Sequence, residues 1–85
     1  MEKIYIPSGV CSRQITIDVN EKDQTVNSVS FVGGCNGNLK GISSLVKGRK
    51  IDGVINDLKG IDCNFKGTSC PDQLAKALEE IKKEL

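Results

Sequence analysis

The hydrophobic periodicity of this sequence changes at Gly33-Gly34, and this change restricts the chain to a small set of folds. Before the two glycines, residues 15–19 alternate between apolar and polar side chains, which indicates a half-buried strand. Residues 26–32 repeat the alternation, and the short polar turn at 20–24 favours an antiparallel hairpin. A shorter apolar alternation at residues 4–6 precedes them. We therefore expect the first part of the chain to form a sheet.

After Gly33-Gly34, the apolar residues recur every three or four positions, which is the spacing of helices with one buried face. The pattern predicts helices at residues 39–46, ended by Gly48, and at residues 51–58, ended by Gly60. A last helix is predicted from Pro71, with one face formed by Leu74, Ala77, Leu78, Ile81 and Leu85. Strands followed by helices predict an α+β fold, with a three-stranded, mainly antiparallel sheet and three helices on one face. The 85 residues fit a single domain, 1–85.

The charge distribution and the N-terminal residues limit the classes of partner and the cellular location. Twelve basic and eleven acidic residues are intermixed, and only Tyr5, Phe31 and Phe65 are aromatic. Nucleic-acid binding proteins usually carry a basic stripe with aromatic residues, so nucleic acid is not an expected partner. The first ten residues lack the apolar run of a signal peptide, and no stretch is long enough to cross a membrane. We therefore expect a cytoplasmic protein without a membrane partner.

The four cysteines are the residues most suited to chemistry. In a reducing cytoplasm, four cysteines in a short chain indicate metal binding or redox chemistry more than structural disulfides. The chain has no histidine, which excludes histidine-based catalysis and mixed Cys/His metal sites. Cys11, Cys35, Cys63 and Cys70 all stand beside the ends of predicted strands or helices, outside the apolar stripes. We therefore expect their sulfur atoms to meet at one end of the domain.

Two of these cysteines stand where the backbone favours a thiolate. Cys70 precedes Pro71 and is the expected N-cap of the last helix, where free N–H groups and the helix dipole stabilise an anion. Cys35 lies within residues 33–38, where three glycines allow the backbone to turn closely around a sulfur atom or an ion.

A metal site is the first interpretation of the four thiols. Four thiolates suit a closed tetrahedral zinc site, and an iron–sulfur cluster, which takes the same ligands, is the alternative. A third interpretation is a thiol–disulfide relay to a reductase, with Cys63 and Cys70 as the closest pair in sequence. An autonomous enzyme is not expected, because the chain is too short for a deep pocket and shows no acid–base pair of carboxylates.

Three segments of the chain resemble the TSCPD domain family. They are TSCPDQLAKAL at residues 68–78, GGCNGNLKGI at residues 33–42 and VCSR at residues 10–13. The family includes small stand-alone proteins and a C-terminal domain of vitamin B12-dependent ribonucleotide reductases. The resemblance implies an accessory module for ribonucleotide reduction, and thus DNA synthesis, with a ribonucleotide reductase as the protein partner.

A more distant likeness connects the chain to the U-type iron–sulfur scaffold proteins. They place cysteines before a strand, after a strand in a Gly-Cys turn and before the last helix, as Cys11, Cys35 and Cys70 are placed here. This chain has Arg13 and Ser69 where the scaffold proteins have an aspartate and a histidine. The likeness implies a scaffold-like fold with iron–sulfur binding, in which Cys63 supplies the fourth ligand.

Overall fold

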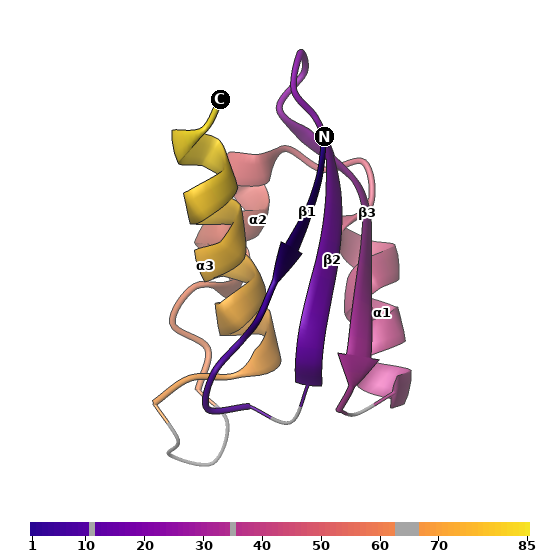
Figure 1. Cartoon of the computed structure of the whole chain (residues 1–85), viewed down its shortest axis with the longest axis vertical. Coiled ribbons are helices and arrows are strands. Elements are labelled where there is room, and N and C mark those ends of the chain that lie inside the picture. The colour runs from indigo at the N-terminus through magenta and orange to yellow at the C-terminus, as the bar shows by residue number, and fades with distance from the viewer. Residues whose placement is uncertain (11, 35, 63–66) are drawn as a thin grey trace.

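A computed structural model describes residues 1–10, 12–34, 36–62 and 67–85. In these residues the elements follow the order β1 (Glu2–Tyr5), β2 (Ser12–Asn20), β3 (Thr25–Gly33), α1 (Asn36–Val46), α2 (Ile51–Leu58) and α3 (Cys70–Lys83). The strands form one antiparallel sheet in the order β1-β2-β3, and the helices lie together along one side of it (Figure 1). The predicted α+β architecture is confirmed.

The register of β2 and β3 places their apolar residues on the helix side of the sheet. Ile17 pairs with Val29, and Ile15 pairs with Phe31. The register then shifts between Asp18 and Val19, so that Val19 pairs with Val26. A β-bulge of this kind inserts one extra residue and changes which side chains face inward. Val26 therefore faces the core although it is an odd number of positions away from Val29.

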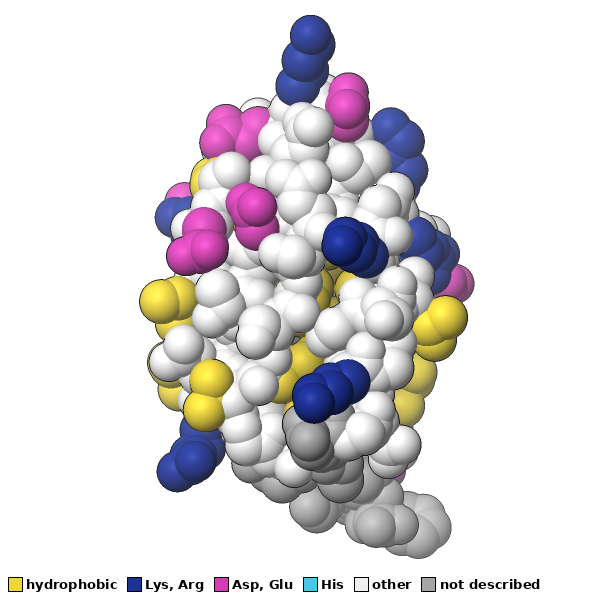
Figure 2. Space-filling model, turned by 90° about the vertical axis from the view of Figure 1, so that its right-hand side faces the viewer, with side chains coloured by type: hydrophobic (Ala, Val, Ile, Leu, Met, Phe, Trp, Pro, Cys, Tyr) yellow, Lys and Arg dark blue, Asp and Glu magenta, His cyan; other side chains and the backbone are white. Residues whose placement is uncertain are grey.

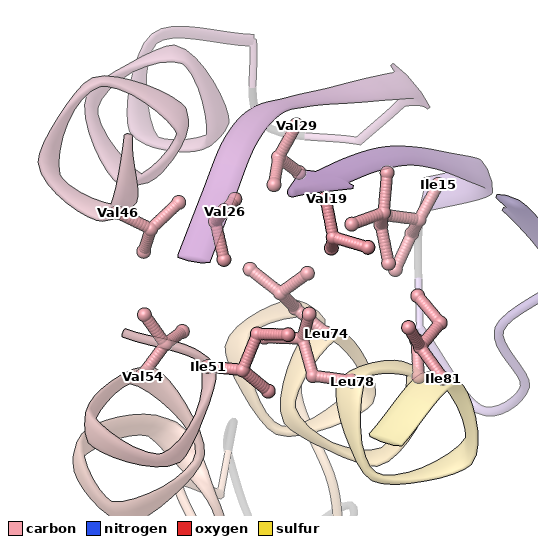
Figure 3. Close-up of a cluster of buried hydrophobic side chains, with 12 residues drawn as sticks. Ile15, Val19, Val26, Val29, Val46, Ile51, Val54, Leu74, Leu78 and Ile81 are labelled. Carbon is pink, nitrogen blue, oxygen red and sulfur yellow. The ribbon is translucent and has the colours of Figure 1, made fainter. Parts of the chain in front are cut away.

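The core lies between this face of the sheet and the three helices. Side chains from β2 and β3 meet those of α2 and α3, and Val46 of α1 closes one side (Figure 3). Leu74 and Leu78 of α3 are fully buried, as are Ile15 and Ile17 of β2. Burying one such side chain contributes roughly 1.5–3 kcal/mol. This core holds α3 against the sheet and so fixes the position of its first residue.

The short strand β1 faces the other way from what its isoleucines suggest. Tyr5 pairs with Ile15 and is half-buried, whereas Ile4 points to the open side of the sheet and is 62% exposed. Ile6 is also exposed. At the other end of the chain, the prediction that Leu85 lies on the buried face of the last helix is wrong. The helix α3 ends at Lys83, and Leu85 lies beyond it and is exposed.

The glycines end the elements largely as predicted. Gly48 and Gly60 follow α1 and α2 with φ angles of 81° and 87°, values that favour glycine. Gly33 and Gly34 also have positive φ angles, and they turn the chain after β3. The expectation that Gly37 shares this turn is wrong, because α1 begins at Asn36 and Gly37 is helical.

The surface formed by β3 and α1 carries scattered basic and acidic side chains among uncharged ones (Figure 2). Apolar atoms show at the bottom of a hollow of about 380 Å³ between the two elements. Within the described ranges, no helix combines the length and the apolar character needed to cross a membrane.

Candidate functional site

Cys70 is the first residue of α3, and its side chain is buried, with 8% of its surface exposed. The expectation that Cys70 is the N-cap is therefore wrong. The N-cap is Ser69, which has an extended backbone and whose side-chain oxygen accepts the N–H of Asp72 at 3.1 Å. Pro71 falls within the first turn, where a missing N–H removes no helical hydrogen bond. The expectation that Cys70 lies outside the buried surface is wrong too, since the core packing of α3 turns this residue inward.

The carboxylate of Asp72 joins both ends of the connection between α2 and α3. It accepts the backbone N–H of Gly60 at 2.7 Å and the hydroxyl of Thr68 at 2.6 Å, and the ammonium of Lys76 lies 3.4 Å away. The Ser69 hydroxyl donates to the carbonyl of Ile61 across the same connection. Asp72 is 3% exposed, so its carboxylate is largely shielded from water, whereas the side chain of its partner Lys76 is 47% exposed. The start of α3 thereby fixes both ends of the segment that contains Cys63.

The pKa of Asp72 reflects this environment. Burial has the largest single effect and raises the pKa of the carboxyl. The hydrogen bonds from Thr68 and Gly60, with Lys76, favour the charged form and together outweigh burial, so the pKa is below its ordinary value. Asp72 is thus a buried carboxylate that stays ionised because its partners are already in place.

Gln73 ties the connection between β1 and β2 to the same helix turn. Its side-chain oxygen accepts the N–H of Ser8 at 3.2 Å, and its amide donates to the hydroxyl of Thr68 at 2.9 Å. Gly9 also lies close to Thr68: a Cβ atom added to Gly9 would stand 3.2 Å from the Thr68 methyl carbon. The segment that leads to Cys11 is therefore held against the start of α3.

Ser12, the first residue of β2, is in direct contact with Cys70. Its Oγ atom lies 3.2 Å from the Cys70 Sγ atom, and the Ser12 side chain is 2% exposed. Ser12 also pairs with Gly33 at the end of β3. The start of β2, the end of β3 and the start of α3 consequently meet at the lower end of the molecule in Figure 1.

An apolar groove of about 550 Å³ opens beside Cys70, between α1 and the start of α3. Leu45 and Ile61 border this groove and are 75% and 42% exposed. Gly37 and Asp62 also contribute to its wall. The groove thus brings Cys70 together with residues that stand close in sequence to Cys35 and Cys63.

The structure tests the predicted ligands only in part. Cys70 is described, whereas Cys11, Cys35 and Cys63 lie outside the described residues. Among residues 1–10, 12–34, 36–62 and 67–85, no three acidic or cysteine side chains gather closely enough to hold a metal ion. What the structure brings together at one end is Cys70, Ser12, Gly33, Gly37 and Asp62.

The comparison with protein families agrees with the sequence segments noted above. The family model of the TSCPD domain matches residues 1–82, nearly the whole chain. The chain belongs to the TSCPD domain family. Comparisons with curated proteins and with solved structures give no match. The likeness to the iron–sulfur scaffold proteins stays a prediction.

The five residues that give the TSCPD family its name, residues 68–72, lead into α3 and form its N-cap and the start of its first turn. Thr68, Ser69 and Asp72 hold the adjoining connections, Pro71 fits the first turn, and Cys70 is the remaining member, in contact with Ser12. Sequence reasoning missed both Asp72 and Ser12. For Asp72 a signal existed, because a serine followed three residues later by an acidic residue is typical of a helix start. For Ser12 no local signal exists, since its partner lies 58 residues away.

Proposed function

We propose that this TSCPD protein is a zinc-binding accessory module for ribonucleotide reduction, with Cys11, Cys35, Cys63 and Cys70 as thiolate ligands. The single observation that carries this proposal is the gathering of residues around Cys70. Ser12 touches Cys70, and Gly37 and Asp62 line the same groove as Cys70. Each of these three residues stands one or two positions from another cysteine.

Chain connectivity is compatible with a common site for the four sulfur atoms. A step of one or two residues covers at most about 7 Å between Cα atoms. The connections that lead to Cys11 and Cys63 are also anchored on α3, by Gln73 and by Asp72. A set of four thiols without histidine suits a tetrahedral zinc ion, which would add a cross-link among three connections.

The surroundings of Cys70 favour a metal ligand over an exchanging thiol. A relay needs an accessible thiolate that can attack a disulfide, whereas Cys70 is 8% exposed and packed against Ser12. Its position in the first turn of a 14-residue helix favours the negative charge that a metal-bound sulfur carries. Both features suit a ligand that stays in place.

Elemental analysis and absorption spectroscopy on protein purified without oxygen test the metal. We expect about one zinc per chain and a colourless protein, and Cys70→Ser should reduce the zinc content strongly. A brown protein that contains iron and sulfide would indicate an iron–sulfur cluster instead of zinc. A metal-free protein with four titratable thiols would contradict the metal proposal altogether.

For the partner, we propose a vitamin B12-dependent ribonucleotide reductase that docks on the groove beside Cys70. Family membership suggests the class of partner, and the exposed side chains of Leu45 and Ile61 offer apolar surface at that end. A binding assay with the purified reductase tests this. Leu45→Lys should weaken binding, while Ile4→Lys, on the open face of the sheet, should leave it unchanged. Absence of binding by the wild-type chain, or equal loss in both variants, would contradict this docking surface.

A further inference from the structure

The geometry points to Ser12 as a positioning residue for the metal ligand Cys70: its hydroxyl lies within hydrogen-bond distance of the Cys70 sulfur and would donate to that sulfur when the metal is bound. This inference rests on the proposed function, since it concerns the same sulfur. It adds to the four thiols a residue that binds no metal itself. The observation behind it is the 3.2 Å contact between Ser12 Oγ and Cys70 Sγ, both on buried side chains.

The chemistry of the two atoms sets the direction of this hydrogen bond. In the metal-free thiol, either atom can be the donor, because both carry a proton. A metal-bound thiolate has lost its proton and can only accept. The Ser12 hydroxyl must then rotate so that its proton points to the sulfur. The two heavy atoms already stand at a distance that suits this hydrogen bond, since 3.2 Å separates Ser12 Oγ from Cys70 Sγ.

Two further features give this contact weight. Ser12 is held by the sheet, since it pairs with Gly33, and Cys70 is held by the first turn of α3, so the hydroxyl and the sulfur meet without ordering a loose side chain. The low exposure of both side chains limits competition from water. Partners of this kind orient metal ligands, and their removal typically weakens metal binding by about 10- to 100-fold.

The test compares zinc and cobalt(II) binding by the wild-type chain, Ser12→Ala, Ser12→Thr and Ser30→Ala. Ser30 lies on β3 and is exposed, so its variant controls for the loss of a strand hydroxyl elsewhere. Competition with a chromophoric chelator gives the zinc affinity. The sulfur-to-cobalt charge-transfer bands report the electron density on the ligand sulfur.

We expect Ser12→Ala to bind one metal ion with about tenfold weaker affinity. Its charge-transfer bands should move to longer wavelength, because a sulfur without the hydrogen bond gives up electron density more easily. Ser12→Thr keeps a hydroxyl and should restore both readouts, and it also serves if the alanine variant does not fold. Ser30→Ala should behave as the wild-type chain.

The outcomes separate the two proposals. Unchanged affinity and bands in Ser12→Ala, with normal metal binding by the wild-type chain, would overturn the role of Ser12 alone. An equal effect of Ser30→Ala would overturn it as well. A wild-type chain that binds neither zinc nor cobalt would overturn the metal site, and this inference with it.

Discussion

The backbone N–H of Gly60 donates a hydrogen bond to the carboxylate of Asp72, with 2.7 Å between nitrogen and oxygen. Gly60 lies at the start of the connection that leaves α2, and Asp72 lies in the first turn of α3, so this bond links the two ends of that connection. The second carboxylate oxygen accepts the hydroxyl of Thr68 from the other end of the segment. One buried side chain thus links Gly60 and Thr68, which stand on either side of Cys63 in the sequence.

Asp72→Asn should destabilise the fold by about 1–3 kcal/mol, because an amide cannot accept both hydrogen bonds and leaves a buried polar group poorly paired. The free energy of unfolding in urea measures this loss. Asp57→Asn is the matched control, since Asp57 forms a surface ion pair with Arg49 at 2.7 Å. Such an exposed pair contributes about 0–1 kcal/mol. Equal losses in the two variants would show that the Asp72 network adds little.

The lowered pKa of Asp72 predicts a loss of stability in acid. The folded state binds a proton on Asp72 less readily than the unfolded chain, in which the pKa of an aspartate is about 3.9. The stabilisation is therefore complete above that pH and disappears as the pH falls through the lower pKa of the folded state. The stability difference between the wild-type chain and Asp72→Asn should shrink in this acid range. A difference that stays constant from neutral pH into the acid range would contradict the assigned charge.

Two leucines on different helices test the position of the core. Leu74→Ala should cost about 2–5 kcal/mol, because Leu74 is fully buried and its removal leaves a cavity beneath the sheet. Leu45→Ala should change the free energy of unfolding by less than about 0.5 kcal/mol, since Leu45 is 75% exposed. Urea denaturation of both variants measures the contrast. Similar costs would mean that α1 and α3 pack differently from the arrangement in Figure 1.

Metal binding should be coupled to stability. A strong chelator should lower the melting temperature of the wild-type chain, because a ligand that binds only the folded state stabilises it by about 2.7 kcal/mol at a free concentration of 100 times its Kd. Cys70→Ser should melt lower than the wild-type chain and should not respond to the chelator. If the chelator lowers the melting temperature of both proteins equally, the metal it removes is not held by Cys70.

Much of the fold could be predicted from the sequence, because periodicity and glycines act locally. The alternation at residues 15–19 indicated β2, and Gly48 and Gly60 marked the ends of two helices. The orientation of β1 could not be predicted, because the sequence allows either Ile4 or Tyr5 to face the core. The pairing of Tyr5 with Ile15 decides that Tyr5 faces inward.

The candidate site could be predicted less well, because it depends on contacts between distant segments. The assignment of Cys70 as N-cap failed because Pro71 is also compatible with the second helical position, which leaves Ser69 as the cap. The contact of Ser12 with Cys70 and that of Ser8 with Gln73 link the two ends of the sequence. Such contacts follow from the packing of α3 on the sheet, and no local sequence pattern predicts this packing.

We propose that one metal ion is bound by the sulfur atoms of Cys11, Cys35, Cys63 and Cys70. X-ray absorption at the zinc edge, on protein purified without oxygen, tests it most directly. We expect one zinc per chain with four sulfur neighbours at about 2.3 Å and no nitrogen or oxygen ligand. A first shell of nitrogen and oxygen atoms, or one with fewer than four sulfur atoms, would contradict it.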